Sequence, residues 1–313
     1  MIKSSAEIIK AAQALSENGR RRRIAVAVAQ DADVIGAVQS AFADGICDGS
    51  LFGNEVKIKE LAEKNKVPIE GLEIINQTDP AQAVMEAVEL AATGQADAVM
   101  KGFVSTSALL KGVLDKRFNL RTSPTLSHVA VLTIPGYHKL LMLTDGGMVV
   151  KPTLEQRFDI LKNAILVGKA LGIDPVKIAL AAATDHVTPK MPQTEDDAKL
   201  VKMVEAEKID GCLAAGPMSF DVATSKEIAA RAGIENSVAG DADVYLVGSI
   251  EECNVSSKTM IVFGKAIFAG VIVGAKVPVS LVSRTDPLIG KKTSIALACL
   301  VSDFYQRMEG GRS

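Results

Sequence analysis

Two short stretches of this 313-residue chain place a cationic side chain just beyond a run that reads as a buried strand. Lys101 follows the run 96–99, and Ser283 and Arg284 follow the run 277–282. Arg presents a planar fork that can bind phosphate through two hydrogen bonds, whereas Lys provides a mobile point charge. If both runs are parallel strands, these residues lie beyond strand carboxyl ends, where open α/β sheets bind their ligands. The pattern therefore predicts an enzyme that handles a phosphate or an acyl phosphate.

The alternation of apolar runs with segments of helical period indicates how these residues are positioned. It favours a parallel sheet with right-handed crossovers in both halves of the chain. Segment 135–138 (Pro-Gly-Tyr-His) separates two apolar runs and predicts a hairpin, which would add an antiparallel element. The expected strands are 24–29, 49–52, 72–75, 96–99, 127–134, 139–144, 176–183, 211–214, 243–247, 269–273 and 279–282. The expected helices are 4–19, 33–43, 56–65, 80–92, 154–171, 194–207, 221–232, 251–263 and 291–308.

Composition and charge narrow the classes of function. With 35 basic and 37 acidic residues the net charge is −2, so we expect no broad basic face for nucleic acid. The four cysteines form no CxxC pair, which argues against zinc sites and disulfide frameworks. The longest apolar stretch, 261–282, is interrupted by Lys265 and Lys276, and the N-terminus lacks a signal-type apolar core. We therefore expect a cytoplasmic protein that binds neither nucleic acid nor a membrane.

The sequence lacks the common short motifs for cofactors and nucleophiles. It has no GxGxxG after the first expected strand, no GxSxG and no HExxH. Segment 290–293 (Gly-Lys-Lys-Thr) resembles the end of a P-loop, but Thr285 stands where the first glycine is required. The three histidines are far apart in the sequence, so no metal site is predicted. Asp145 precedes two glycines at the end of an apolar run, and is either a turn former or a ligand.

Several stretches together resemble the phosphate acetyl/butyryl transferase family, most closely its phosphate butyryltransferase branch. They lie between about residues 98 and 300, and their order and spacing are more specific than any one of them. The matching stretches are 100–102 with 106–107, 126–129, 144–147, 189–192, 216–221, 239–243, and 274–279 leading into 283–286.

The resemblance implies a fold and a reaction. The fold would be that of isocitrate and isopropylmalate dehydrogenases, with two α/β domains and a cleft between them. The first domain would comprise residues 1–144 and 278–313, and the second residues 145–277. The reaction would convert acyl-CoA and inorganic phosphate into acyl phosphate and CoA, with a butyryl, acetyl or branched acyl group. The family implies CoA as a substrate, no cofactor or metal, and a homodimer or higher homo-oligomer.

The resemblance also implies site residues. Ser283 and Arg284 would act at the acyl and phosphate groups, and Asp286 is the expected base toward the CoA thiol. The expected substrate-binding residues are Lys101, Thr106, Ser107, Ser127, His128 and Asp145. The acetyltransferase branch has an Asp seven positions after the Ser of its Ser-Arg pair, whereas this chain has Gly290 there.

A second departure concerns the loop 247–254. At 248–249 this chain has Gly-Ser where the family that it resembles usually has Pro-Asp. At 252–253 it has Glu-Cys where that family usually has Ala-Gly. Two alternatives to the acyltransferase stay open, and the altered loop favours only the second of them. One is a metal- and NAD-dependent dehydrogenase on the same fold, and the other is a non-catalytic family member that binds CoA or an acyl phosphate as a sensor.

Overall fold

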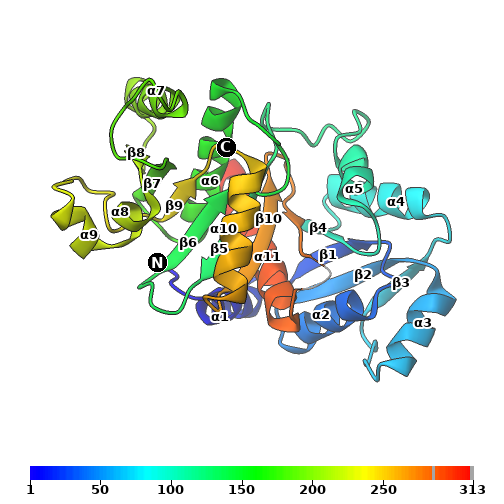
Figure 1. The fold of residues 1–313 in the computed structure, drawn as a ribbon. Helices are drawn as coiled ribbons and strands as arrows, with labels where there is room; N and C mark the ends of the chain where they lie inside the picture. The colour runs from blue at the N-terminus through cyan, green and yellow to red at the C-terminus, as the bar shows by residue number, and fades with distance from the viewer. Residues whose placement is uncertain (284–285, 311–313) are drawn as a thin grey trace. The chain divides into compact units, whose positions relative to one another are not determined.

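The computed structural model of the protein describes residues 1–283 and 286–310. The chain forms two compact units, which Figure 1 follows by colour along the chain. The terminal unit consists of Ser5–Thr122 and Phe268–Ser313, and the central unit of Met1–Ser4 and Ser123–Ile267. No helix among the described residues combines the length and apolarity that crossing a membrane requires.

The terminal unit is built on a sheet with the strand order β3-β2-β1-β4-β11-β10. Neighbouring strands from β3 to β11 pair in parallel, and β10 pairs antiparallel with β11. The strands are β1 (Arg22–Ala27), β2 (Cys47–Gly53), β3 (Glu73–Asn76), β4 (Ala98–Lys101), β10 (Ile267–Val273, whose first residue belongs to the central unit) and β11 (Val279–Ser280).

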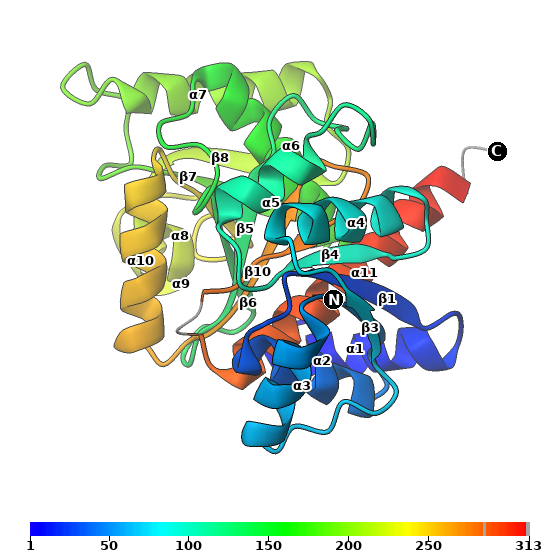
Figure 2. The same ribbon diagram turned by 90° about the vertical axis from the view of Figure 1, so that its right-hand side faces the viewer.

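Helices cover both faces of this sheet. They are α1 (Ser5–Glu17), α2 (Ala32–Ala43), α3 (Glu55–Lys64), α4 (Pro80–Ala92), α5 (Thr106–Val113) and α11 (Leu288–Gly310). Figure 2 shows α4 and α5 on one side of β1 and β4, with α1 and α2 on the other. Because both faces are covered, the strands are near-continuous apolar runs; residues 24–27 of β1, for example, are fully buried.

The central unit contains the predicted hairpin. Its strands are β5 (Ser127–Thr133), β6 (Leu140–Thr144), β7 (Val176–Ala181), β8 (Cys212–Met218) and β9 (Val244–Leu246). β5 and β6 pair antiparallel, and the order continues in parallel as β6-β9-β7-β8. The helices are α6 (Leu154–Ala170), α7 (Gln193–Ala206), α8 (Phe220–Thr224), α9 (Lys226–Arg231) and α10 (Ile250–Val262).

The unit boundaries differ from those expected from the sequence. The chain passes between units at 122/123 and 267/268, not at 144/145 and 277/278, and residues 1–4 belong to the central unit. The first difference arises because β6 pairs with β9, so the hairpin joins the central unit. The second arises because most of β10 pairs and packs within the terminal unit, beside β11.

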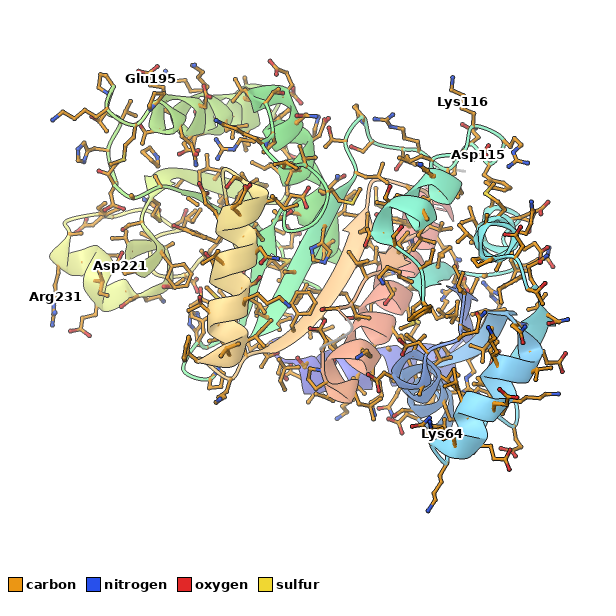
Figure 3. All side chains as sticks on the ribbon, turned by 45° about the vertical axis from the view of Figure 1, so that its right-hand side comes forward. Lys64, Asp115, Lys116, Glu195, Asp221 and Arg231 are labelled. Carbon is orange, nitrogen blue, oxygen red and sulfur yellow. The ribbon has the colours of Figure 1, made fainter. Side chains whose placement is uncertain are left out.

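The expected helix 221–232 is in fact two short helices, α8 and α9. Ser225 separates them in an extended conformation, with φ −126° and ψ 113°. Its hydroxyl accepts a hydrogen bond from the amide of Ile228, so Ser225 is the N-cap of α9. Outside the core, exposed charged side chains such as Lys64, Lys116 and Arg231 point away from the ribbon (Figure 3).

Gly102 lies where the loop after β4 touches the chain after β1, and we expect Gly102→Ala to be destabilising. A Cβ atom there would overlap the carbonyl oxygen of Val28 and lie 2.6 Å from that of Ala27. Backbone atoms cannot rotate away, so the free energy of unfolding should fall by about 1–3 kcal/mol.

Urea unfolding measures this effect, with Gly36→Ala as the matched control. In the helix α2, a Cβ on Gly36 would meet only Val67 Cγ2, at 3.9 Å. That substitution should leave stability unchanged or raise it by about 0.5–1 kcal/mol. Equal stability of the two variants would show that the two loops can move apart without lowering the free energy of unfolding.

Candidate functional site

Three parallel strands of the terminal unit end at one edge of its sheet. β1, β4 and β11 are neighbours in the order β1-β4-β11, and all three run in the same direction. The chain leaves β1 toward β2 on one side and later returns to β4 on the other, so a topological switch point lies between β1 and β4. Lys101 is the last residue of β4, and Ser283 follows β11 by three residues. The structure thus places these two predicted residues at the same sheet edge.

The loop after β4 is held against the end of β1 by backbone hydrogen bonds. The amide of Gly102 donates to Ala27 O at 3.0 Å, and that of Phe103 to Val28 O at 2.6 Å. Ser105 is the N-cap of α5, since its hydroxyl accepts from the amide of Ala108 at 3.1 Å.

The predicted hydroxyl residues Thr106 and Ser107 therefore occupy the first two positions of α5. Thr106 is half-buried and Ser107 is exposed. The first amides of a helix have no partner within it, and the helix dipole adds positive potential, so such an end attracts anions.

The side chain of Lys101 folds over this same loop. Its ammonium donates to Val104 O at 3.2 Å and to Gly102 O at 3.4 Å. The side chain is half-buried, so its positive charge stays at the carboxyl end of β4. Together with the start of α5, it contributes positive charge to this edge of the sheet.

Asp286 fixes the turn that carries Ser283. Its carboxylate oxygen Oδ2 accepts the amide of Ser283 at 2.7 Å, and its own amide donates to Ser283 O at 3.2 Å. Asp286 is buried. Arg284, the second member of the predicted pair, lies outside the described residues.

Sequence reasoning missed one charged residue beside this turn. Lys291, in the first turn of α11, is buried, and its ammonium donates to the carbonyl oxygen of Asp286. The only sequence signal was a lysine at the start of a largely apolar helix, a position where lysine is ordinarily exposed.

The remaining predicted residues belong to the central unit, where Asp145 organises a second turn. Its carboxylate accepts backbone amides from Gly147 and Val149 at 2.9 Å, and from His128 and Met148 at 3.1 Å. Burial raises the pKa of Asp145, while these four donors act in the opposite direction. Since its oxygens are engaged by the backbone, the structure favours the turn-forming alternative for this residue.

His128 and Ser127 stand at the start of β5 and are both buried. The hydroxyl of Thr144 donates to His128 O at 3.1 Å. Burial lowers the pKa of the His128 imidazole to about 4, so the ring is neutral at pH 7. The Ser127 hydroxyl accepts Asn163 Nδ2 of α6 at 3.0 Å.

The unusual loop 247–254 has its own cap. The hydroxyl of Ser249 accepts the amide of Glu252 at 3.3 Å, and Glu252 Oε2 accepts the amide of Gly248 at 2.8 Å. These two hydrogen bonds fix the start of α10, with Ser249 as its N-cap.

Cys253 packs against the turn that Asp145 organises. A Cβ atom on Gly146 would lie 2.9 Å from its Sγ, so the glycine leaves room for the sulfur. Burial raises the pKa of the Cys253 thiol to about 12, which keeps it protonated and unreactive. Cys47 and Cys299 are buried as well, and Cys212 is half-buried.

Two further observations concern ligand sites. In the described part of the chain, no group of three or more His, Cys, Asp or Glu side chains could hold a metal ion. A mostly apolar cavity of about 730 Å³ opens in the central unit at the carboxyl ends of β7 and β9, beside α10. Its volume suits a small molecule.

The low pKa of His128 predicts a loss of stability in acid. The folded pKa, about 4, lies below the ordinary value of 6.5, so between these values the unfolded chain binds a proton that the folded chain does not. Stability should therefore fall as the pH drops from 6.5 toward 4, by up to about 3 kcal/mol from this group.

Unfolding free energies at pH 7 and pH 4.5 test this for the unmodified protein and for His128→Gln. Other acidic groups contribute equally to both proteins, so only the difference in pH dependence is informative. The dependence should be weaker in His128→Gln. Parallel profiles would show that His128 becomes protonated in the folded protein.

Comparison with known proteins adds a family and a fold. The model of the phosphate acetyl/butaryl transferase family matches residues 5–85 and 80–299. A phosphate butyryltransferase of Clostridium acetobutylicum is 41% identical over 302 residues, which are 96% of this chain and 99% of that relative.

Solved structures are similar as well, among them a phosphotransacylase and a dehydrogenase. A branched-chain phosphotransacylase from Enterococcus faecalis superposes with a TM-score of 0.80 at 31% identity, over 90% of this chain and 99% of that one. A 4-hydroxythreonine-4-phosphate dehydrogenase from Klebsiella pneumoniae has a TM-score of 0.58 over the same shares of the two chains. Its identity is 12%, so this second likeness concerns the fold alone.

Proposed function

The chain belongs to the phosphate acetyl/butaryl transferase family and is a phosphate acyltransferase, and we propose that its reaction takes place around Ser283. The acyl group is short, such as butyryl, acetyl or isobutyryl, and moves between coenzyme A and inorganic phosphate. One observation carries the assignment of this site. Lys101, the start of α5, and Ser283 with its hydrogen-bonded partner Asp286 all lie at one edge of the terminal unit's sheet.

Phosphate would bind at the electropositive part of this edge. The ammonium of Lys101 and the first amides of α5 provide charge and hydrogen-bond donors for its oxygens. Arg284 is assigned to the same anion from its place in the sequence, because a guanidinium can bind two phosphate oxygens at once. The roles of Ser127, His128 and Asp145 in substrate binding stay predictions.

The chemical step needs no nucleophile from the protein. In one direction a phosphate oxygen attacks the thioester carbonyl carbon, the C–S bond breaks, and CoA leaves as a thiolate that takes up a proton. In the other direction the CoA thiol loses its proton, the thiolate attacks the acyl phosphate, and the C–O bond to phosphate breaks. Holding the two substrates together supplies much of the acceleration. Ser283 would donate a hydrogen bond to the developing oxyanion.

The proton of the CoA thiol requires a base, and Asp286 is the better candidate. It adjoins Ser283, although its Oδ2 already accepts the Ser283 amide. Asp145 is the alternative, but four backbone amides engage its carboxylate.

An assay of free thiol released from acetyl-, butyryl- and isobutyryl-CoA tests the function. We expect release that depends on added phosphate, with a rate that ranks the three acyl groups. Binding of CoA without turnover would instead identify a sensor. The altered loop was the one feature that favoured a sensor, and the cap formed by Ser249 and Glu252 restores its local order. Reduction of NAD in the presence of a divalent metal would identify a dehydrogenase.

The assignment of Lys101 to phosphate predicts the effect of Lys101→Ala. Removing the ammonium should raise the Michaelis constant for phosphate by about tenfold, corresponding to roughly 1.4 kcal/mol of lost binding. The constant for acyl-CoA should change little. Initial rates with each substrate varied in turn measure both constants. If only the Michaelis constant for acyl-CoA changed, the Lys101 ammonium would act on acyl-CoA and not on phosphate.

The two roles of Asp286 can be separated with two substitutions. In Asp286→Asn the side-chain carbonyl can still accept the Ser283 amide, but the base is lost, whereas Asp286→Ala loses both functions. We expect Asp286→Asn to slow attack of CoA on acyl phosphate at pH 7 and to recover partly toward pH 9. Recovery follows because the unperturbed pKa of a thiol is about 8.5, so solvent then generates the thiolate.

Asp286→Ala should stay slow at both pH values, because the turn itself is no longer fixed. Rates between pH 6.5 and 9 measure these profiles. If Asp286→Asn had a profile parallel to that of the unmodified enzyme, the carboxylate would be needed for the turn and not as a base.

We also propose that the protein assembles as a homodimer, as its family resemblance implies. Exposed apolar side chains on and after α10 support an association surface in the central unit. Val255, Val262 and Phe263 are all exposed there.

A further inference from the structure

Lys291 is buried, although apolar residues next to it in the sequence are exposed. In the first turn of α11, Lys291 is 2% exposed, whereas the apolar residues Leu288 and Ile289 are 52% and 39% exposed. Hydrophobicity alone would produce the opposite arrangement. Burying an ammonium is costly unless polar partners replace its water. The partners of Lys291 should therefore explain its position.

Its ammonium joins two segments at the sheet edge. One partner is the carbonyl oxygen of Asp286, to which the ammonium donates a hydrogen bond. Another is Asp33 Oδ2, at 3.6 Å, in the first turn of α2, the helix that follows β1. Asp33 is itself largely exposed, so this second contact is the weaker one.

The contact with Asp286 reaches Ser283 through one residue. Lys291 donates a hydrogen bond to the main-chain carbonyl of Asp286, and the side chain of Asp286 accepts one from the amide of Ser283. The turn is thus fixed from both sides, by a buried ammonium on its carbonyl and by a carboxylate on its first amide.

We infer that Lys291 is a positioning residue for acyl transfer: its buried ammonium fixes the turn that presents Ser283 to the reacting carbonyl. The inference rests on the proposed function for the role of Ser283, whereas the contacts that fix the turn do not depend on it. The simpler alternative is that Lys291 only attaches α11 to α2. In that case its removal lowers stability without changing turnover by the folded enzyme.

Lys291→Met tests the inference, because Met keeps the length and apolar body of the side chain and removes the charge. The folded variant should lose about 10- to 100-fold in kcat, as small displacements of reacting groups do. The KM for acyl-CoA should stay within about twofold, since the lost interaction acts in the transition state. Lys292→Met is the matched control. Lys292 pairs with Asp44 at the other end of α2, and its loss should leave kcat within about twofold.

Hydrogen exchange provides a second readout that needs no turnover. The amides of Ser283 and Asp286 should exchange faster in Lys291→Met, while those of β1 and β4 keep their protection. If Lys291→Met does not fold, Asp33→Asn replaces it, because the Asp33 side chain is 71% exposed and not required for packing. Asp33→Asn should leave the melting temperature unchanged and speed exchange at the same two amides to a smaller extent.

Unchanged kcat in folded Lys291→Met, or equal losses in Lys291→Met and Lys292→Met, would contradict the inference. Unchanged exchange at Ser283 and Asp286 in the variant that folds would also contradict it. The exchange result is separate from the proposed function. If the unmodified protein released no thiol, the function would fail while the role of Lys291 in fixing the turn could still be confirmed.

Discussion

Parallel pairing of β1, β4 and β11 is the constraint on which the terminal unit's site depends. Parallel strands end at the same edge, so three loops that are distant in sequence must share that edge. The loops can lie close together only because Gly102 has no side chain to separate the chain after β4 from the chain after β1. The ammonium of Lys101, the start of α5 and the Ser283 turn are brought to one edge by this backbone arrangement.

Both turns that carry predicted site residues are organised by buried carboxylates. Asp286 accepts one backbone amide in the terminal unit, and Asp145 accepts four in the central unit. A carboxylate can satisfy several amides that a tight turn leaves without backbone partners. Asp286 retains more acceptor capacity than Asp145, and this difference is why it is the better candidate for a base.

Features with a local signal were predicted from the sequence. The mixed α/β fold, the hairpin at 135–138 and the family are confirmed, because apolar runs, turn residues and motif order are properties of short segments. The unit boundaries depend on the pairing of β6 with β9, a contact between residues about 100 positions apart, which no local pattern encodes. The partners of Lys291 and Asp145 were unpredictable for a related reason. From sequence alone a charged side chain is expected to be exposed, and only the folded structure shows that it has a buried partner. The break between α8 and α9 at Ser225 is similar, because it depends on a single hydrogen bond from the Ile228 amide to the Ser225 hydroxyl.

The burial of the cysteines has a practical consequence for enzymology. Chromogenic disulfide reagents react with thiolates that they can reach, and Cys47, Cys253 and Cys299 are enclosed. Cys212 is partly accessible, but burial raises the pKa of its thiol to about 11, so little of it ionises near neutral pH. The native protein should therefore contribute almost no colour of its own, and a continuous thiol readout would report coenzyme A even at high enzyme concentration.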